Sequence, residues 1–246
     1  MIVLLRHDSQ AQIIIHTANL IPRDWENMTQ AVWRSPLLPI MPPGIPRLSG
    51  DPSMGSGHRF KIDFLNYLRA YDKKQRICKP LIEQLTKFDF SSIRGALVGS
   101  VPGRYSQAPN GDTKWGWPAL RHVLNSVPVQ QGGQPEVIVQ ISSIATLGQS
   151  NQWLEKTFFK SLSTSNSQTS SIPAFKIIFP TADEIRRSLN GYLSGFSIHT
   201  KINSPAQMKQ FQYLKPLLHH WAGDGAKQVP GTTLSLRSHI DIGVDY

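Results

Sequence analysis

A short polar segment follows an apolar run near the start of the sequence. Residues 13–25 read IIIHTANLIPRDW, so three isoleucines end at His16-Thr17-Ala18-Asn19. Three consecutive β-branched residues predict a fully buried strand, and the change to polar residues marks its end. Strand ends are where α/β folds display binding and catalytic side chains. The segment around Asn19 is therefore a candidate for one half of an active site.

Hydroxyl-bearing residues follow a second predicted strand and suggest phosphate binding. The stretch EVIVQISSIATLG (136–148) begins as a strand and continues into a segment of mostly small residues. That segment consists of Ser142, Ser143, Ile144, Ala145 and Thr146. Hydroxyls and backbone N–H groups after a strand can approach phosphates closely, and Arg104 in the turn PGRY is a further candidate phosphate contact. Ordinary turn chemistry without function remains the alternative for each of them.

Several other chemistries are disfavoured. The sequence has no GxGxxG, P-loop or HExxH motif. Its carboxylates are sparse, and TADEI and DWE are simpler to interpret as helix starts than as an acid/base pair. The adjacent histidines of LHHW (218–221) would point in different directions on a helix, which disfavours a metal site. Cys78 is the only cysteine, which excludes an internal disulfide and a cysteine-built zinc site.

The composition favours a folded protein with an acidic partner. The 246 residues carry a net charge of +10, with 39% hydrophobic and 17% charged residues. Such a balance is typical of globular rather than disordered chains, and the positive charge favours nucleic acid. The single cysteine suits a reducing compartment. No apolar run approaches the length of a membrane helix.

Alternating strands and helices are predicted to position these candidates. The chain opens with a hairpin of strands at 2–5 and 13–16, followed by a short helix or turn within 24–33 and a long Pro/Gly-rich loop at 35–57. Trp25 and Trp33 are predicted to be core aromatics. Further helices are predicted at 58–74, 77–90, 119–127, 151–162, 181–189 and 204–221. Segment 95–106 is predicted to begin as a buried strand and to end in a Pro-Gly turn, 136–148 to be a strand leaving into a small-residue segment, and 175–180 to be a strand. Thr181 is expected to be a helix N-cap, with Glu184 completing the capping box. This alternation indicates an α/β fold.

The Asn19 segment and several later segments together resemble one known family. A strand followed by His-Thr-x-Asn-Leu resembles the asparagine half of the phospholipase D superfamily motif, and more closely the tyrosyl-DNA phosphodiesterase family. The segments GALVGSVPGRY, VIVQISSIATLGQSNQWL, IIFPTADEIRRSLNGYLSGFSIHTKINSPAQMKQ and YLKPLLHHW resemble that family in the same order. The resemblance covers the chain from Met1 to about Trp221.

The resemblance implies a fold and a mechanism. The fold would be two phospholipase D-like α/β domains with mixed sheets flanked by helices, each contributing one His-x-Lys and one asparagine to a shared site. Residues 1–104 would be the C-terminal part of the first domain, and residues 105–246 the N-terminal part of the second. One neutral histidine would attack phosphorus to form a phosphohistidine, while the other protonates the tyrosine leaving group and then activates water. Lysines and asparagines would bind the non-bridging oxygens, and no cofactor or metal is implied.

The site residues carry over position by position. Asn19 matches the asparagine of the first domain, and Gln30 matches a polar neighbour of the site. Arg104 resembles a phosphate contact. The segment that contacts DNA in the family matches Ser142, Ser143, Ile144, Ala145 and Thr146.

The His-x-Lys pairs do not carry over in the same way. The first would fall immediately before Met1. His239 stands roughly where the second histidine is expected, but Asp241 occupies the lysine position and would repel a phosphate. His199-Thr200-Lys201 matches the His-x-Lys pattern but resembles a segment upstream of the second motif, so we expect His199 and Lys201 to line a DNA groove rather than to catalyse.

The expected function is therefore that of a DNA-repair enzyme, although this chain is not expected to hydrolyse the substrate itself. The resemblance implies a nuclear phosphodiesterase that hydrolyses 3′-phosphotyrosyl bonds between topoisomerase I and DNA. Its expected partners are single-stranded or nicked DNA and a topoisomerase-derived peptide, with no membrane association and a monomeric state. Because intact His-x-Lys pairs are missing, this chain is expected to be inactive as written. A noncatalytic DNA-binding remnant and an incomplete gene product are the alternatives.

Overall fold

The chain forms two compact units, each described here by itself. The computed structural model describes residues 1–26, 28, 30–44, 52–105, 114–128, 135–164, 172–200 and 202–220. The first unit comprises Met1–Ile15, Val32–Pro128 and Thr164–Asn166, and the second comprises His16–Ala31, Val129–Ser163 and Ser167–Tyr246. The predicted domain boundary after Arg104 stays a prediction. No described helix has the length and apolar character needed to span a bilayer.

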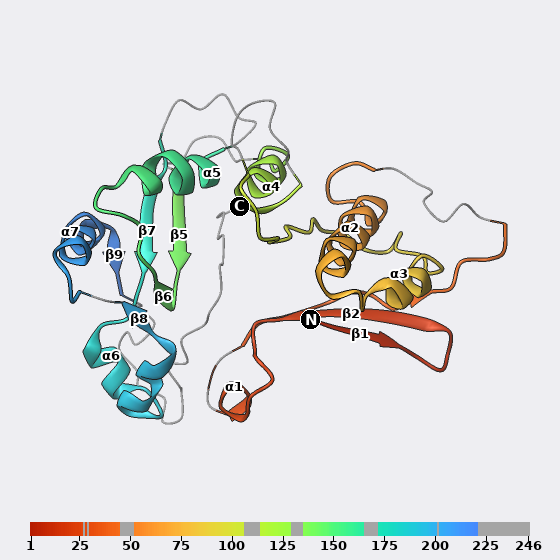
Figure 1. Cartoon of the computed structure of the whole chain (residues 1–246), viewed down its shortest axis with the longest axis horizontal. Helices are drawn as coiled ribbons and strands as arrows, with labels where there is room; N and C mark the ends of the chain where they lie inside the picture. The colour runs from red at the N-terminus through yellow and green to blue at the C-terminus, as the bar shows by residue number, and fades with distance from the viewer. Residues whose placement is uncertain are drawn as a thin grey trace. The chain divides into compact units, whose positions relative to one another are not determined.

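The first unit contains an antiparallel sheet that leads to the Asn19 segment. Its strands are β1 (Ile2–Leu5), β2 (Gln10–His16), β3 (Val32–Arg34) and β4 (Leu38–Pro39), with β2 paired to each of the other three. Figure 1 labels the hairpin of β1 and β2. Pairing of Ile2 with Ile14 and of Leu5 with Ala11 confirms the predicted hairpin. The second strand begins earlier than expected, at Gln10, because Ala11 and Ile13 alternate with glutamines and bury one face.

Helices α2 (Gly57–Gln75), α3 (Lys79–Leu85) and α4 (Gly116–Leu124) belong to the same unit (Figure 1). The apolar face predicted for α2 is confirmed, and Trp33 packs against this core with its ring 5.2 Å from that of Phe60. The buried core residues are Ala11, Ile13, Leu38, Phe60, Phe64, Leu65, Leu68, Leu85, Phe88, Phe90 and Ile93.

Two predictions for this unit are wrong. The helix expected over 77–90 is confined to α3, because the chain beyond Leu85 turns toward Lys61, whose ammonium donates to the Thr86 and Phe88 carbonyls. The strand expected over 95–106 is absent from its described part, residues 95–105, where Gly99 makes only an isolated bridge to Trp115. The Pro-Gly turn expected at the end of this segment is present, since Pro102 and Gly103 form a bend, and the proline lacks the N–H that a central strand would need.

The second unit is built on parallel strands. Strands β5 (Glu136–Gln140), β7 (Ala174–Ile178) and β9 (Leu218–His219) form a sheet in the order β5-β7-β9, as Figure 1 shows. Strand β6 (Ser143–Ile144) pairs in parallel with β8 (His199–Thr200). The predicted strand over 136–148 is therefore divided, so that Ser142 and Ser143 lie where the chain passes from one sheet to the other.

The helices of the second unit are short. They are α1 (Pro22–Glu26), the π-helix η1 (Leu154–Phe159) continuing into α5 (Lys160–Leu162), α6 (Ala182–Arg187), the 3₁₀-helix η2 (Gly191–Ser197), α7 (Pro205–Leu214) and the 3₁₀-helix η3 (Lys215–Leu217). The capping box of Thr181 and Glu184 is confirmed at α6.

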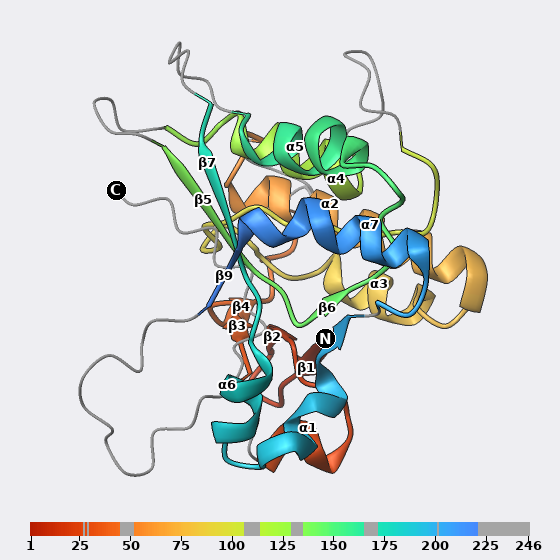
Figure 2. The same cartoon turned by 90° about the vertical axis from the view of Figure 1, so that its left-hand side faces the viewer.

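The helix predicted over 204–221 is shorter than expected. It ends as α7 at Leu214, and the chain continues through η3 into β9, a course that Figure 2 shows. Pro216 explains the end of the helix, because a proline inside an α-helix lacks the required N–H and clashes with the preceding turn.

Candidate functional site

Asn19 lies in a tight turn directly after β2, and a buried carboxylate holds it there. Oδ2 of Asp24 accepts hydrogen bonds from the backbone N of Asn19 at 2.6 Å and from its Nδ2 at 2.9 Å. Asp24 is only 6% exposed and lies in α1, whereas Asn19 is exposed. One carboxylate therefore fixes both the backbone and the side chain of the predicted catalytic asparagine. We call residues 16–26 the Asn19 turn.

Gln30 is joined to the Asn19 turn through two residues. Its Oε1 accepts a hydrogen bond from Thr17 Oγ1 at 2.6 Å, and its Nε2 donates to the Asp24 carbonyl at 3.2 Å. Thr17 Oγ1 also accepts from the backbone N of Ala31 at 2.8 Å. The structure thus brings Gln30 and Asn19 to the same turn. Their roles toward a phosphate stay predictions.

Trp25 is not a core residue, which corrects the prediction made for it. It is 59% exposed, its indole N–H donates to the Asn19 carbonyl at 2.8 Å, and its ring lies 5.9 Å from that of His16. The hydrogen bond explains the exposure, because it holds the indole over the surface of the turn. Nδ1 of His16 is buried and has no hydrogen-bond partner among the described atoms.

Asp24 is the residue of this turn that sequence reasoning missed. The segment DWE was interpreted as a helix start, and α1 confirms this, with Asp24 in its first turn. A carboxylate five residues after an asparagine carries no specific sequence signal, since only the closed turn brings the two side chains together.

Ser143 and His199 lie side by side in a second candidate site. Pairing of β6 with β8 places these residues opposite each other, and Ser143 Oγ is 3.3 Å from His199 Nδ1. The backbone N of His199 also donates to the carbonyl of Ser142 at 3.0 Å. A pocket of about 360 Å³, which we call the Ser143 pocket, opens beside them. It is lined by Ser143, Ile144, Ala145, Thr146, His199, Gln207 and Gln210.

The chemistry of the Ser143 pocket suits an anion. Two hydroxyls, an imidazole and two carboxamides can all donate hydrogen bonds, and the described residues that line the pocket include no carboxylate. Four of the five residues of the predicted DNA-contact segment 142–146 line it, and the fifth, Ser142, accepts a hydrogen bond from the backbone N of His199 through its carbonyl. The sequence did not single out Gln207 or Gln210, because nothing in one helix reveals which loop its polar face will meet.

The remaining candidates lie elsewhere. Arg104 is exposed in the first unit. His239, Asp241 and Lys201 lie outside the described residues. His219 and His220 have different neighbours, since His219 Nδ1 lies 2.8 Å from the Leu217 carbonyl and His220 Nδ1 lies 3.6 Å from Glu184 Oε1.

A family model for tyrosyl-DNA phosphodiesterase matches residues 1–240. The chain belongs to the tyrosyl-DNA phosphodiesterase family. Tyrosyl-DNA phosphodiesterase 1 of Drosophila melanogaster is 32% identical over 218 residues, which cover 87% of this chain and 36% of the fly protein. A probable tyrosyl-DNA phosphodiesterase of Caenorhabditis elegans is 29% identical and covers 86% of this chain and 45% of the worm protein.

The predicted mixed α/β fold is confirmed by solved structures, whereas its division into two incomplete domains stays a prediction. The crystal structure of yeast tyrosyl-DNA phosphodiesterase matches with a TM-score of 0.60 at 18% identity, covering 87% of this chain and 49% of the yeast chain. The family and the mixed α/β fold are thus as the sequence predicted. This chain spans less than half the length of these two relatives and about half of the yeast chain.

Loss of the Asp24 carboxylate is expected to open the Asn19 turn. Hydrogen bonds to a charged group contribute about 2 kcal/mol, so in Asp24→Ala the backbone amide of Asn19 should exchange its hydrogen about thirtyfold faster. Amide hydrogen exchange followed by NMR measures this effect. Glu26→Ala changes an exposed carboxylate of the same helix and should leave the rate unchanged. Equal rates in Asp24→Ala and the parent would contradict the role of Asp24.

Proposed function

We propose that this chain provides the DNA-binding surface of a DNA-repair phosphodiesterase of its family, with a 3′-phosphotyrosyl end of single-stranded or nicked DNA as substrate. The observation that carries this proposal is the Ser143 pocket. There a hydroxyl and an imidazole, supplied by two paired strands, converge beside the predicted DNA-contact segment. Family membership supports the reaction class, and the net charge of +10 supports an anionic polymer as partner.

The Asn19 turn has a separate role in this proposal. The Asn19 carboxamide has two N–H groups, and a single hydrogen bond to Asp24 leaves the second available for a non-bridging phosphate oxygen. By donating to that oxygen, Asn19 would offset the charge that develops when the phosphodiester is attacked.

Chemistry by these 246 residues alone is not part of the proposal. The only His-x-Lys in the sequence is His199-Thr200-Lys201, and His199 is engaged beside Ser143. We therefore expect DNA binding by this chain with little hydrolysis of a 3′-phosphotyrosyl oligonucleotide. Robust turnover by the purified chain that is lost in His199→Ala would overturn this assignment. A topoisomerase-derived peptide on the DNA end, a monomeric state and a nuclear location are proposed with it.

DNA affinity of Ser143 variants tests the pocket. Loss of one hydrogen bond to a charged oxygen is expected to weaken binding of a fluorescent single-stranded oligonucleotide about tenfold in Ser143→Ala. Fluorescence anisotropy at several salt concentrations measures both the Kd and its salt dependence. Because serine is neutral, the slope of log Kd against log salt should stay as in the parent.

Thr200→Val is the matched control for Ser143→Ala. Thr200 is exposed on β8 next to His199 but does not line the pocket, and valine removes only its hydroxyl. Its Kd should equal that of the parent. If Ser143→Ala bound the oligonucleotide as tightly as Thr200→Val, the Ser143 pocket would not be the DNA contact.

A further inference from the structure

We propose that Gln210 is a positioning residue that holds the DNA-contact segment in its binding geometry, an inference that rests on the proposed function. Gln210 lies on α7 and is 4% exposed. Its Oε1 accepts a hydrogen bond from the backbone N of Leu147, and its Nε2 donates to the carbonyl of Ala145, both at 2.8 Å. One carboxamide thus binds two backbone groups of the segment that follows β6.

The backbone of the segment that follows β6 needs hydrogen-bond partners from outside the sheet. Strand β6 has only two residues, and the segment beyond it leaves the sheet with backbone groups that require partners. A carboxamide carries a donor and an acceptor in one plane, so it can satisfy an N–H and a C=O of one segment together, as a neighbouring strand would. The uncharged carboxamides of asparagine and glutamine offer this combination at any pH near neutrality, and glutamine has the longer reach.

A second side chain of α7 supports the same segment. One turn after Gln210, the hydroxyl of Tyr213 donates to the carbonyl of Gly148 at 3.0 Å. Burial raises the pKa of the Tyr213 hydroxyl above its ordinary value, which keeps it protonated as a donor. Gly148 has φ +106°, a conformation that L side chains rarely adopt, so the segment turns sharply at the point where α7 holds it.

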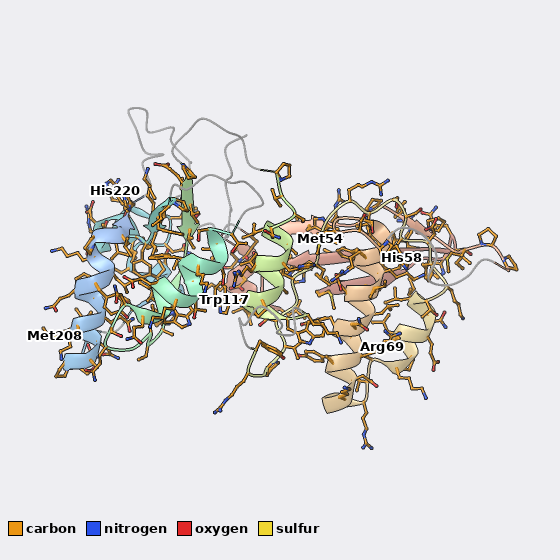
Figure 3. The ribbon with its side chains drawn as sticks, turned by 90° about the horizontal axis from the view of Figure 1, so that it is seen from above. Met54, His58, Arg69, Trp117, Met208 and His220 are labelled. Carbon is orange, nitrogen blue, oxygen red and sulfur yellow. The ribbon has the colours of Figure 1, made fainter. Side chains whose placement is uncertain are left out.

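The face of α7 that carries these bonds is fixed by its N-terminus. The Ser204 side chain caps the helix by accepting from the backbone N of Gln207, and Oε1 of Gln207 accepts from the backbone N of Ser204. Met208, labelled in Figure 3, lies on the outer side of the helix and is 58% exposed. The capped helix therefore presents Gln210 and Tyr213 inward as a rigid support for residues 145–148.

This support acts on the Ser143 pocket directly. Gln210 lines the pocket, and the residues between its anchor points and β6 are those predicted to contact DNA. If the two hydrogen bonds were lost, Ala145 and Thr146 would sample other conformations, and the bound geometry would be only a fraction of the population. Loss of the Gln210 carboxamide would therefore lower DNA affinity through the segment that it holds, not through a DNA contact of its own.

Three variants of the 246-residue chain test this inference. Gln210→Leu removes both hydrogen bonds, Gln210→Glu keeps the acceptor for the Leu147 N–H, and Gln212→Leu changes an exposed glutamine of the same helix as control. The readouts are the hydrogen exchange rate of the Leu147 amide and the Kd for single-stranded DNA. We expect both to rise about tenfold or more in Gln210→Leu and to stay at the parent values in Gln212→Leu.

Gln210→Glu adds a pH dependence of the Kd that would not appear if Gln210 only filled space in the core. Its ionised carboxylate repels the Ala145 carbonyl, whereas the protonated acid can donate to it as the amide does. The Kd ratio of Gln210→Glu to parent should therefore fall toward one as the pH is lowered from 7 to 5, the range above the ordinary glutamate pKa of about 4.3 where protonation begins. A ratio that does not change with pH would count against the positioning role.

The outcomes separate this inference from the proposed function. Faster exchange at Leu147 with an unchanged Kd in Gln210→Leu would overturn the positioning role, provided that Ser143→Ala still weakens binding. If the Kd stayed at the parent value in both Gln210→Leu and Ser143→Ala, the Ser143 pocket would not be the DNA-binding site. If Gln210→Leu does not fold, Tyr213→Phe removes only the bond to Gly148 and should weaken DNA binding about threefold. A parent-like Kd for both Tyr213→Phe and Gln210→Glu at pH 7 would refute the support by α7.

Discussion

Gly57→Ala is expected to destabilise the first unit by about 3 kcal/mol or more, the upper end of what overpacking a buried position costs. A Cβ atom on Gly57 would lie 1.8 Å from the carbonyl oxygen of Phe90 and 3.0 Å from Cα of Ser91. Both neighbours are backbone atoms, so no side-chain rotation can relieve the clash. Alanine is favoured over glycine inside a helix by about 1 kcal/mol, which is too little to offset it.

Thermal unfolding and hydrogen exchange of the α2 amides measure this effect. Gly195→Ala is the matched control, because its Cβ would meet only Ile185 Cγ2 at 3.7 Å, an ordinary contact. The control should change stability by less than about 0.5 kcal/mol. If Gly57→Ala unfolded at the same temperature as Gly195→Ala, the close approach of α2 to the Phe90 backbone would not exist in solution.

Local patterns predicted the elements of this fold better than their ends. The apolar spacing of Phe60 and Phe64 predicted α2, and Thr181 with Glu184 predicted the start of α6, because both patterns act within a few residues. The ends of α3 and α7 depend on Lys61 and Pro216. The proline is visible in the sequence, whereas the contact between Lys61 and the chain after α3 forms only when distant segments meet.

The candidate site follows the same rule. The strand-end pattern at His16 to Asn19 and the hydroxyl residues at 142–146 were visible as motifs. The residues that hold them were not, since Asp24 reaches Asn19 through a folded turn and Gln210 reaches Leu147 across 63 positions of sequence. His199 differs, because its His-x-Lys letters match a catalytic motif while its sequence context predicts a groove position, and it lies opposite Ser143 in the lining of the pocket. Tertiary contacts of this kind leave no periodic trace in a single sequence.

Lys61→Met is expected to destabilise the first unit by about 2 to 3 kcal/mol, because two backbone carbonyls lose a charged donor. Lys61 is 3% exposed, and its Nζ donates to Thr86 O at 3.0 Å and to Phe88 O at 2.7 Å while lying 5.3 Å from the centre of the Phe90 ring. Methionine preserves the length of the side chain, so little cavity forms. Removing the buried ammonium also removes its desolvation cost, which offsets part of the lost hydrogen-bond energy. The expected loss of stability therefore stays below that of Gly57→Ala.

Denaturant unfolding of Lys61→Met beside Lys87→Met separates the buried ammonium from lysine removal in general. Lys87 is exposed, and its Nζ donates to Gln84 Oε1 at 3.2 Å, so its replacement should change stability by less than about 0.5 kcal/mol. The end of α3 reports the mechanism, because the residues after Leu85 are held by the two carbonyl bonds of Lys61. Amides of residues 86–90 should therefore exchange faster in Lys61→Met than in Lys87→Met. Equal exchange and equal stability would show that the ammonium does not fix the end of this helix.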